Sequence, residues 1–279
     1  HYFSSEWQKN STVQTIDMRL ADQVHVDYLV IAPLEIDGKA IAAMAIGIHH
    51  ELSNSDENLL KMFNHQAAMV VQRAILYEQL RKQYLNTIEA LVNVIEAKDK
   101  YTEGHSRRVS RFAVEIAKKM RYSNEDIENV EISGLLHDVG KIGIHQSILT
   151  KEGKLTNEEY EIMKEHPLKG IQVLESIGLN NKIRDGILYH HLRYDLKGYP
   201  KADHELKSLP EFAAIIGAAD AFDAITSARS YSKARSVEEA IGELEKHEGT
   251  QFSPSMVHIF KTLVEEDYQT IIEIIEDKM

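Results

Sequence analysis

The chain has 279 residues, no cysteine, and a formal net charge of −12 from 44 acidic and 32 basic residues. The absence of cysteine excludes disulfides, thiolate nucleophiles and cysteine-bound zinc or iron–sulfur centres, so a metal site must use His, Asp and Glu. The negative charge argues against broad binding to polymeric nucleic acid or to an anionic membrane. No apolar run approaches the ~20 residues that span a bilayer, and no signal peptide opens the chain, so we expect a soluble cytoplasmic protein or fragment.

The first part of the chain predicts a small antiparallel sheet. Residues 28–50 form two apolar, β-rich runs around Asp37-Gly38, a dipeptide typical of tight hairpin turns. A helix is expected from about residue 55, because Ser53 or Ser55 together with Asp56 supplies an N-cap and apolar residues follow at helical spacing.

The next segment predicts a long connecting helix. No Gly or Pro occurs between Gly47 and Gly104, and the helical period resumes at Leu80 after a polar patch. Two ordinary amphipathic helices would explain the pattern equally well. A continuous helix would favour a parallel dimer.

The remainder predicts an all-α domain. We expect helices at about 106–120, 125–138, 156–165, 167–177, 181–191, 210–227, 236–247 and 254–276. The predicted fold is therefore α+β overall, with domains at residues 1–82 and 83–279.

Candidate metal ligands recur at inward-facing positions of these helices. They are His105, the pair His137-Asp138, His166, the pair His190-His191, and Asp220. Each alone is a weak signal, because a single His on an apolar face is usually an ordinary core residue. Together, several buried imidazoles and two carboxylates would cost several kcal/mol per charge unless paired or bound to metal. More than four ligands indicates two divalent ions, which suits phosphoester hydrolysis.

Several motifs in one order resemble the HD-GYP phosphodiesterases, a branch of the HD metal-dependent phosphohydrolases, from about Asn86 to Ala240. The motifs are Glu96-Ala-Lys-Asp-Lys-Tyr-Thr-Glu-Gly-His105, Gly134-Leu-Leu-His137-Asp138-Val-Gly-Lys141, His166-Pro167, His190-His191-Leu-Arg-Tyr-Asp195-Leu-Lys-Gly198-Tyr199-Pro200, and Asp220-Ala-Phe-Asp223 through Arg229 to Tyr231. The resemblance implies a helical domain with a centre of two or three metal ions, commonly Fe or Mn, that linearises cyclic di-GMP to pGpG, and in some members on to GMP.

The same resemblance implies roles for individual residues. His105, His137, Asp138 and Asp220 would hold one metal ion, and Asp138 would bridge to a second ion held by His166, His190 and His191. Lys141 would contact the scissile phosphate or orient the nucleophile, so Lys141 and Asp138 are the expected catalytic residues. Tyr199, Arg229, Arg193 and Lys141 would contact the dinucleotide. Structural alternatives are that Lys141 is only a helix-end charge and that Gly198-Tyr-Pro is only a tight turn.

The sequence departs from the family pattern at three positions. Tyr101 replaces a Glu that accompanies a third metal, so we expect two ions. Leu192 and Leu196 replace the usual Glu and Gly, which alters charge and backbone freedom and leaves cyclic GMP–AMP open as a substrate. The alternative to an enzyme is a degenerate domain that binds a cyclic dinucleotide or a protein partner without turnover. Hydrolysis of another nucleotide is disfavoured by Gly198-Tyr-Pro.

Residues 1–82 resemble the C-terminal part of a GAF domain. The resemblance depends on the strand pair around Asp37-Gly38, on Leu52-Ser-Asn-Ser-Asp-Glu-Asn-Leu-Leu60 and on the helix that continues to Tyr77. The usual first strands and helix are missing, which suggests that His1 lies inside a longer chain. The resemblance implies a sensor or dimerisation module, and we expect a homodimer through this part and the connecting helix.

Overall fold

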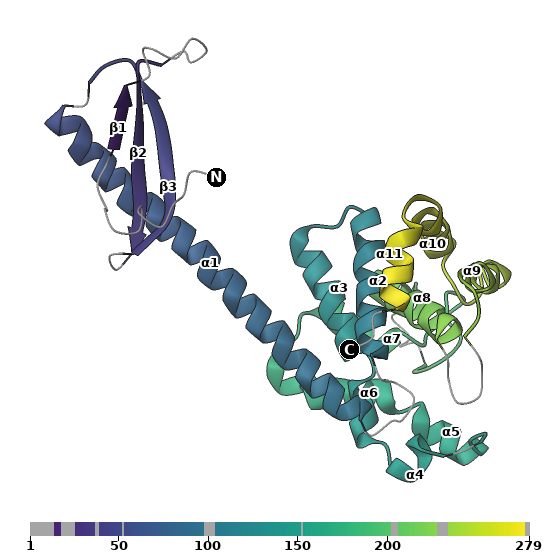
Figure 1. The fold of residues 1–279 in the computed structure, drawn as a ribbon. Helices are drawn as coiled ribbons and strands as arrows, with labels where there is room; N and C mark the ends of the chain where they lie inside the picture. The colour runs from purple at the N-terminus through teal and green to yellow at the C-terminus, as the bar shows by residue number, and fades with distance from the viewer. Residues whose placement is uncertain are drawn as a thin grey trace. The chain divides into compact units, whose positions relative to one another are not determined.

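The computed structural model describes residues 14–17, 26–36, 39–51, 53–97, 104–151, 153–201, 206–227 and 234–276 (Figure 1). The chain divides into two units, His1–Tyr84 and Leu85–Met279. One unit contains an antiparallel sheet, the other consists of helices and loops, and a long helix begins in the first and ends in the second. The predicted α+β fold is therefore confirmed.

The sheet of the first unit has three strands in the order β1-β2-β3. They are β1 (Gln14–Asp17), β2 (Tyr28–Ile36) and β3 (Lys39–Ile48). The predicted pair is β2 and β3, which run antiparallel with Tyr28 opposite Ile48. The Asp37-Gly38 turn lies outside the described residues, and the short β1 was not predicted. Burial of Val30, Ala32 and Leu34 follows the two-residue period of a strand.

The connecting segment is a single helix, α1 (Asn54–Glu96), of 43 residues. Of the two interpretations that the sequence left open, the structure shows the continuous one. Ser53 and Asp56 form a reciprocal cap: Asp56 N–H donates to Ser53 Oγ at 3.2 Å, and Ser53 N–H donates to Asp56 Oδ2 at 2.9 Å. Neither α1 nor any other helix in the described part of the chain is long and apolar enough to span a membrane.

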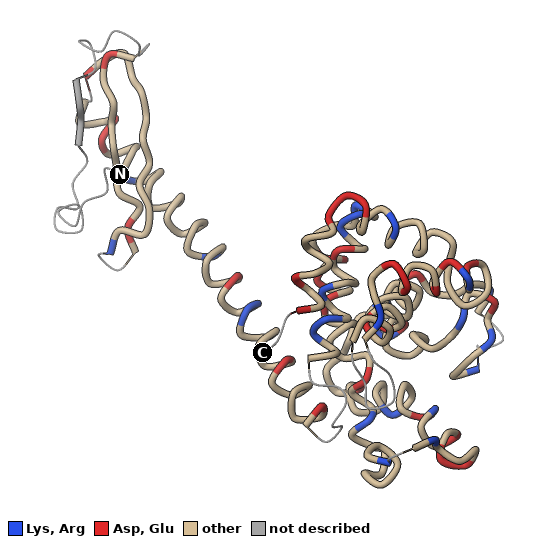
Figure 2. Tube along the Cα trace, turned by 45° about the vertical axis from the view of Figure 1, so that its right-hand side comes forward, with Lys and Arg blue, Asp and Glu red and all other residues tan. Residues whose placement is uncertain are grey.

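The second unit packs short helices around two large apolar cores and one small one. They are α2 (His105–Lys119), α3 (Asn124–Leu136), η2 (Val139–Gly143), α4 (Gln146–Leu149), α5 (Asn157–Met163), α6 (His166–Leu174), η3 (Glu175–Ile177), α7 (Asn181–Tyr189), α8 (Glu211–Thr226), α9 (Val237–Lys246), α10 (Pro254–Glu266) and α11 (Tyr268–Ile275). The strongly helical character was predicted, but η2 and α4 were not. Acidic and basic residues are interspersed along these helices (Figure 2).

The prediction of a single helix at 254–276 is wrong, because this segment forms two helices, α10 and α11. The chain leaves the helical conformation at Asp267, where φ is −146°, and Asp267 Oδ1 accepts the N–H of Thr270 at 3.4 Å. An Asp side chain that bonds to the backbone ahead of it favours the start of a new helix. Ile271 and Ile274 of α11 then become buried in the same core as α2.

The two large cores bring the candidate ligands together. In the first core, Phe112 of α2, Phe222 of α8 and Phe260 of α10 contact one another. In the second core, the end of α1 packs with α3 and α7 through residues such as Ile88 and Ile187. Helices α2 and α8 carry His105 and Asp220, whereas α3 and α7 end just before His137 and His190.

Candidate metal centre

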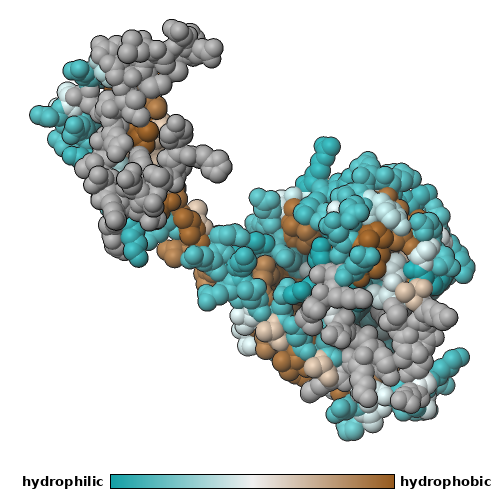
Figure 3. All heavy atoms as spheres, viewed as in Figure 1, coloured by the Kyte–Doolittle hydropathy of each residue, from teal (hydrophilic) through white to brown (hydrophobic). Residues whose placement is uncertain are grey.

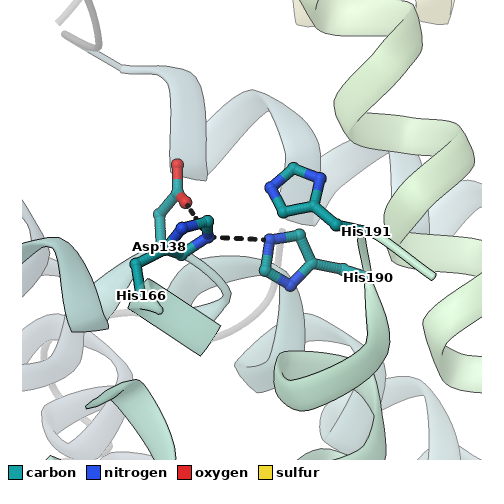
Figure 4. A group of neighbouring side chains, drawn as sticks. All are labelled: Asp138, His166, His190 and His191. Carbon is teal, nitrogen blue, oxygen red and sulfur yellow. Dashed lines mark hydrogen bonds and ion pairs between the residues drawn. The ribbon is translucent and has the colours of Figure 1, made fainter. Parts of the chain in front are cut away.

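The first group of side chains that could hold a metal consists of Asp138, His166, His190 and His191 (Figure 4). One ligand atom from each lies within 4.8 Å of the others. His166 Nε2 is 3.2 Å from Asp138 Oδ1 and 3.3 Å from His190 Nε2. These residues come from the end of α3, the start of α6 and the turn after α7, so the site forms where three helix ends meet.

The second group consists of His105, His137 and Asp138, with ligand atoms again within 4.8 Å of one another. His105 Nε2 is 3.8 Å from Asp138 Oδ2 and 3.3 Å from Asp220 Oδ1. Asp138 thus belongs to both groups, and Asp220 joins the second through His105. All the ligands predicted from the sequence therefore lie in one cluster.

The imidazole rings are oriented so that Nε2 faces the cluster. His137, His166 and His190 each direct Nδ1 to the carbonyl oxygen three residues earlier, at 2.7, 2.9 and 2.7 Å. A carbonyl oxygen only accepts, so Nδ1–H donates, and in the neutral ring Nε2 keeps its lone pair. The same arrangement fixes the ring of metal-bound histidines in proteins generally.

Those lone pairs fit a bound cation. His137 Nε2 is buried and has no hydrogen-bond partner among the described residues, although buried polar atoms are nearly always paired. His166 Nε2 and His190 Nε2 face each other as two acceptors only 3.3 Å apart. One divalent ion in each of the two groups would satisfy these three nitrogens, and the imidazole and carboxylate donors suit Fe, Mn or Zn.

His105 is oriented by a different partner, Asp223. Its Nδ1 lies 2.7 Å from Asp223 Oδ2, while Arg108 Nε donates to Asp223 Oδ1 at 2.5 Å. Asp223 is 1% exposed, so its charge depends on these partners. Asp223 stands in one of the sequence motifs, but no role was predicted for it. The available signal was a second acid three residues after Asp220 on an otherwise apolar helix.

The charges of the cluster shift its pKa values in opposite directions. Burial lowers the pKa of His191 to about 4 and that of His190 well below its usual value, which keeps both rings neutral. For His105 burial acts in the same direction, but hydrogen bonds to Asp220 and Asp223 outweigh it and raise its pKa to about 9.

The carboxylates remain charged despite their burial. Burial alone would raise the pKa of Asp138, but the positive charge of Lys141 and the neighbouring imidazoles lower it well below its usual value. The pKa of Asp220 is lowered in the same way, against the effect of burial, chiefly by His105. His190 and His191 are thus neutral and both carboxylates are ionised, whereas His105 must release a proton when it binds a divalent metal.

Two glycines allow the close approaches that assemble the cluster. A Cβ at Gly134 would lie 2.5 Å from Ser110 Cα, so the absence of a side chain lets α3 pack closely on α2. A Cβ at Gly140 would lie 1.8 Å from the carbonyl oxygen of His166, so η2 could not otherwise lie against α6. Gly134 thereby brings His137 beside His105.

The predicted catalytic and substrate residues lie around the cluster to different degrees. Lys141 Nζ is 2.8 Å from Asp138 Oδ2. The ring of Tyr199 lies 4.7 Å from the ring of His191. Arg193 lines a cavity that it shares with His191 and Asp220, and its guanidinium is paired with Asp195. Arg229 lies outside the described residues, as does Tyr101.

Comparison with known proteins places the chain in a family. Residues 89–256 match the model of the HD domain family. The cyclic di-GMP phosphodiesterase response regulator RpfG of Xanthomonas campestris is 36% identical over 218 residues, which are 74% of this chain and 57% of the relative. The 3'3'-cGAMP-specific phosphodiesterase 2 of Vibrio cholerae is 29% identical over 220 residues, which are 78% of this chain and 42% of the relative.

The fold of a solved structure agrees with this placement. The crystal structure of the V. cholerae cyclic GMP-AMP specific phosphodiesterase V-cGAP3 matches with a TM-score of 0.52 at 18% identity, covering 68% of this chain and 51% of that one. The chain thus spans only 57% and 42% of the length of the two curated relatives. The family match covers more than half of the present chain, and it includes every candidate ligand. The chain belongs to the HD domain family.

Proposed function

We propose that this protein is a metal-dependent phosphodiesterase that cleaves a cyclic dinucleotide. The observation that carries the proposal is the set of Nε2 atoms of His137, His166 and His190, which face Asp138 while each Nδ1 donates to a carbonyl. So complete a set of oriented ligands suits hydrolysis better than binding alone. The relatives' names support the substrate class, since they specify cyclic di-GMP and 3'3'-cGAMP.

Two divalent ions, Fe or Mn, fit the two groups of ligands. His105, His137, Asp138 and Asp220 would hold one ion, and His166, His190 and His191 would hold the other, with Asp138 shared between them. Bound there, the ions would polarise the phosphate and lower the pKa of a water molecule between them. A cluster with two carboxylates needs a net positive charge before it can accept an anionic phosphodiester.

Lys141 and Tyr199 are the proposed contacts to the substrate. Lys141 is paired with Asp138 at 2.8 Å, so its ammonium group lies at the edge of the cluster where it would hold a phosphate oxygen. Tyr199 is aromatic and lies against His191, so its ring would stack on part of the dinucleotide. We also propose Arg193 and Arg229 as substrate contacts, on the resemblance to the HD-GYP enzymes.

The preferred substrate in this proposal is cyclic di-GMP, which would be cleaved to pGpG or further to GMP. Cyclic GMP–AMP is the alternative substrate. A different function, binding without turnover, is favoured by one observation. Leu196 has a φ of +59°, so the loop before Gly198-Tyr199 adopts a strained left-handed backbone at a position where the HD-GYP motif usually has Gly. Leu192, in place of a Glu, is buried.

An anaerobic assay separates these functions. The purified chain would be loaded with Fe(II) or Mn(II), its metal content measured, and cyclic di-GMP and cyclic GMP–AMP offered separately, with linear products resolved by chromatography. Metal-dependent cleavage that is lost in the double variant His137→Ala, Asp138→Ala supports the enzyme. A chain with about two metals that cuts neither substrate contradicts the phosphodiesterase and supports the binding module.

For the first unit we propose a GAF-like sensor role and a parallel homodimer through α1. Exposed apolar residues on α1 recur every seven positions: Phe63, Val70, Tyr77, Tyr84 and Leu91. Leu59, Leu80 and Val94 occupy the second position of the same heptads and are also exposed. A seven-residue apolar repeat matches the seam of a left-handed coiled coil, so a second copy of α1 is the expected occupant. Figure 3 shows hydrophobic residues at the surface of α1.

A further inference from the structure

The last residue of α1, Glu96, contacts the backbone on both sides of His105. The N–H of Gly104 donates to Glu96 Oε2 and the N–H of Ser106 donates to Glu96 Oε1, each at 2.9 Å. Glu96 is 8% exposed, so these hydrogen bonds are shielded from water. One carboxylate therefore holds the two peptide groups between which the candidate ligand is placed.

Among the residues that the structure describes, Glu96 is the one acidic side chain that caps helix α2. Its N-cap residue is Gly104, which has no side chain and a φ of +69°, and its first turn contains no Asp or Glu. The first N–H groups of a helix need acceptors from elsewhere, and a negative charge near them is stabilising. Glu96 meets both needs from a different helix.

The position of Glu96 is itself fixed by packing. Ile88, Val92 and Glu96 follow one another at intervals of four, so they lie on one face of α1. Ile88 and Val92 are buried against Leu136 of α3 and Val139 of η2, the segment that contains His137 and Asp138. The same face of α1 thus packs on the segment with these two ligands and binds the backbone beside the third.

We propose that Glu96 is a positioning residue that sets the place of His105 in the metal centre, so that the end of α1 is part of that centre. The inference rests on the proposed metal-dependent function. His105 Nε2 is 3.3 Å from Asp220 and 3.8 Å from Asp138, so a displacement of the first turn of α2 would separate Nε2 from its co-ligands. The group formed by His166, His190 and His191 with Asp138 has no such contact with Glu96.

The chain offers a matched control about two turns earlier on α1. Glu89 Oε2 accepts from Arg107 Nη2 at 2.9 Å, so Glu89 also links α1 to the first turn of α2. That contact is between side chains that are about one-third exposed, and it leaves the backbone beside His105 untouched. Glu89→Gln and Glu96→Gln are the same chemical change at two links between the same helices.

The test is a titration of the full chain with Co(II), an anaerobic probe whose visible absorption reports each binding step. Gln retains one oxygen acceptor and replaces the other by an NH2 donor, so Glu96→Gln should lose one of the two backbone bonds. We expect it to weaken one of the two binding steps about 10- to 100-fold, the range typical when the partner that orients a metal ligand is removed. Glu89→Gln should change both steps less than twofold.

Hydrogen exchange gives a second readout, independent of activity. In the metal-free protein, the Gly104 and Ser106 amides should exchange faster in Glu96→Gln than in Glu89→Gln, with unchanged exchange in α8. Equal Co(II) binding by the two variants would overturn the inference, as would an equal loss of both binding steps in Glu96→Gln. Wild-type protein that binds two Co(II) and cleaves no cyclic dinucleotide would contradict the proposed function only, because the comparison of metal affinity would still stand.

Discussion

Asp223 Oδ2 lies 2.7 Å from His105 Nδ1, on the side of the imidazole ring away from the other candidate ligands. The two residues are 118 positions apart in the chain and come from α8 and α2. The carboxylate selects the ring form with the proton on Nδ1 and directs Nε2 at Asp220 and Asp138. The same Asp223 also binds Arg108, so it ties the candidate ligand to the core of the helical unit.

Replacing Asp223 should therefore weaken metal binding without removing a ligand. We expect Asp223→Asn to reduce metal affinity about 10- to 100-fold, because the amide keeps the shape but not the charge that holds His105 and Arg108. Co(II) titration measures the effect. Ser227→Ala is the control, since Ser227 donates to Asp223 Oδ1 at 3.1 Å and contacts no ligand. Equal affinities for the two variants would show that Asp223 does not orient His105.

Asp138 belongs to both groups of ligands, whereas His105 and His190 belong to one group each. We expect Asp138→Ala to abolish both metal-binding steps and His190→Ala to abolish only one. Metal content measured by mass spectrometry should fall from about two ions to none in the first variant and to one in the second. His258→Ala, which changes an exposed histidine on α10, should keep both ions. Two independent sites would instead leave one ion in Asp138→Ala.

Gly140 should be intolerant of any side chain. The Cβ of Gly140→Ala would meet the carbonyl oxygen of His166 at 1.8 Å and the N–H nitrogen of Gly170 at 2.4 Å, both on the backbone of α6. Displacing α6 should lower the free energy of unfolding by about 3 kcal/mol, at the upper end of overpacking effects, and should move His166 out of the cluster. Denaturant unfolding and metal titration measure the two effects.

A glycine in open space provides the control for that change. Gly242 lies within α9, and a Cβ there would meet nothing within 4 Å. Gly242→Ala should raise the free energy of unfolding by about 0.5–1 kcal/mol, the usual gain of alanine over glycine inside a helix. A similar gain in Gly140→Ala would contradict the close packing of η2 on α6.

The fold could be predicted where the signals are local. The cap at Ser53, the absence of Gly and Pro along α1 and the apolar period of α2 each act within a few residues. The break at Asp267 could not be predicted, because the apolar pattern continues through it. That break depends on α11 packing back against α2, a contact that only the folded chain defines.

The candidate site, too, could be predicted only in part. Its imidazoles and carboxylates could be selected from the sequence, because polar residues on inward-facing stripes need partners. Their metal-binding role stays a prediction. The contacts that orient them could not be found, since Glu96 and Asp223 act on His105 across the fold through single distances of 2.7–2.9 Å. Periodicity indicates which face a residue lies on, but not which atom it touches.

Leu196 should destabilise its loop. Its φ of +59° is a left-handed conformation that costs a residue with a Cβ about 1–2 kcal/mol. Glycine would remove this strain, but it would also give the unfolded chain more conformational entropy, which offsets part of the gain. Leu196→Gly should therefore raise the free energy of unfolding by about 1 kcal/mol. Gly178 has a φ of +66°, and a Cβ there would meet no atom within 4 Å. Gly178→Ala would therefore introduce only backbone strain, and it should lower the free energy of unfolding by about the same amount. Unfolding curves that move in the same direction for both would contradict this account.

The dimer proposed for α1 can be tested by introducing a glutamate separately at two adjacent residues of the helix, one on the proposed seam and one off it. Leu80 lies on the exposed heptad stripe, at 66% exposure, and a second α1 would bury it. Gln79 is its exposed neighbour and lies off the stripe. Because a glutamate in the seam would be desolvated beside its own copy, Leu80→Glu should weaken dimerisation at least 10-fold, whereas Gln79→Glu should change it less than twofold. Analytical ultracentrifugation over a concentration series measures both. A monomeric wild-type chain would exclude the coiled coil, and a dimer unaffected by Leu80→Glu would place its interface elsewhere.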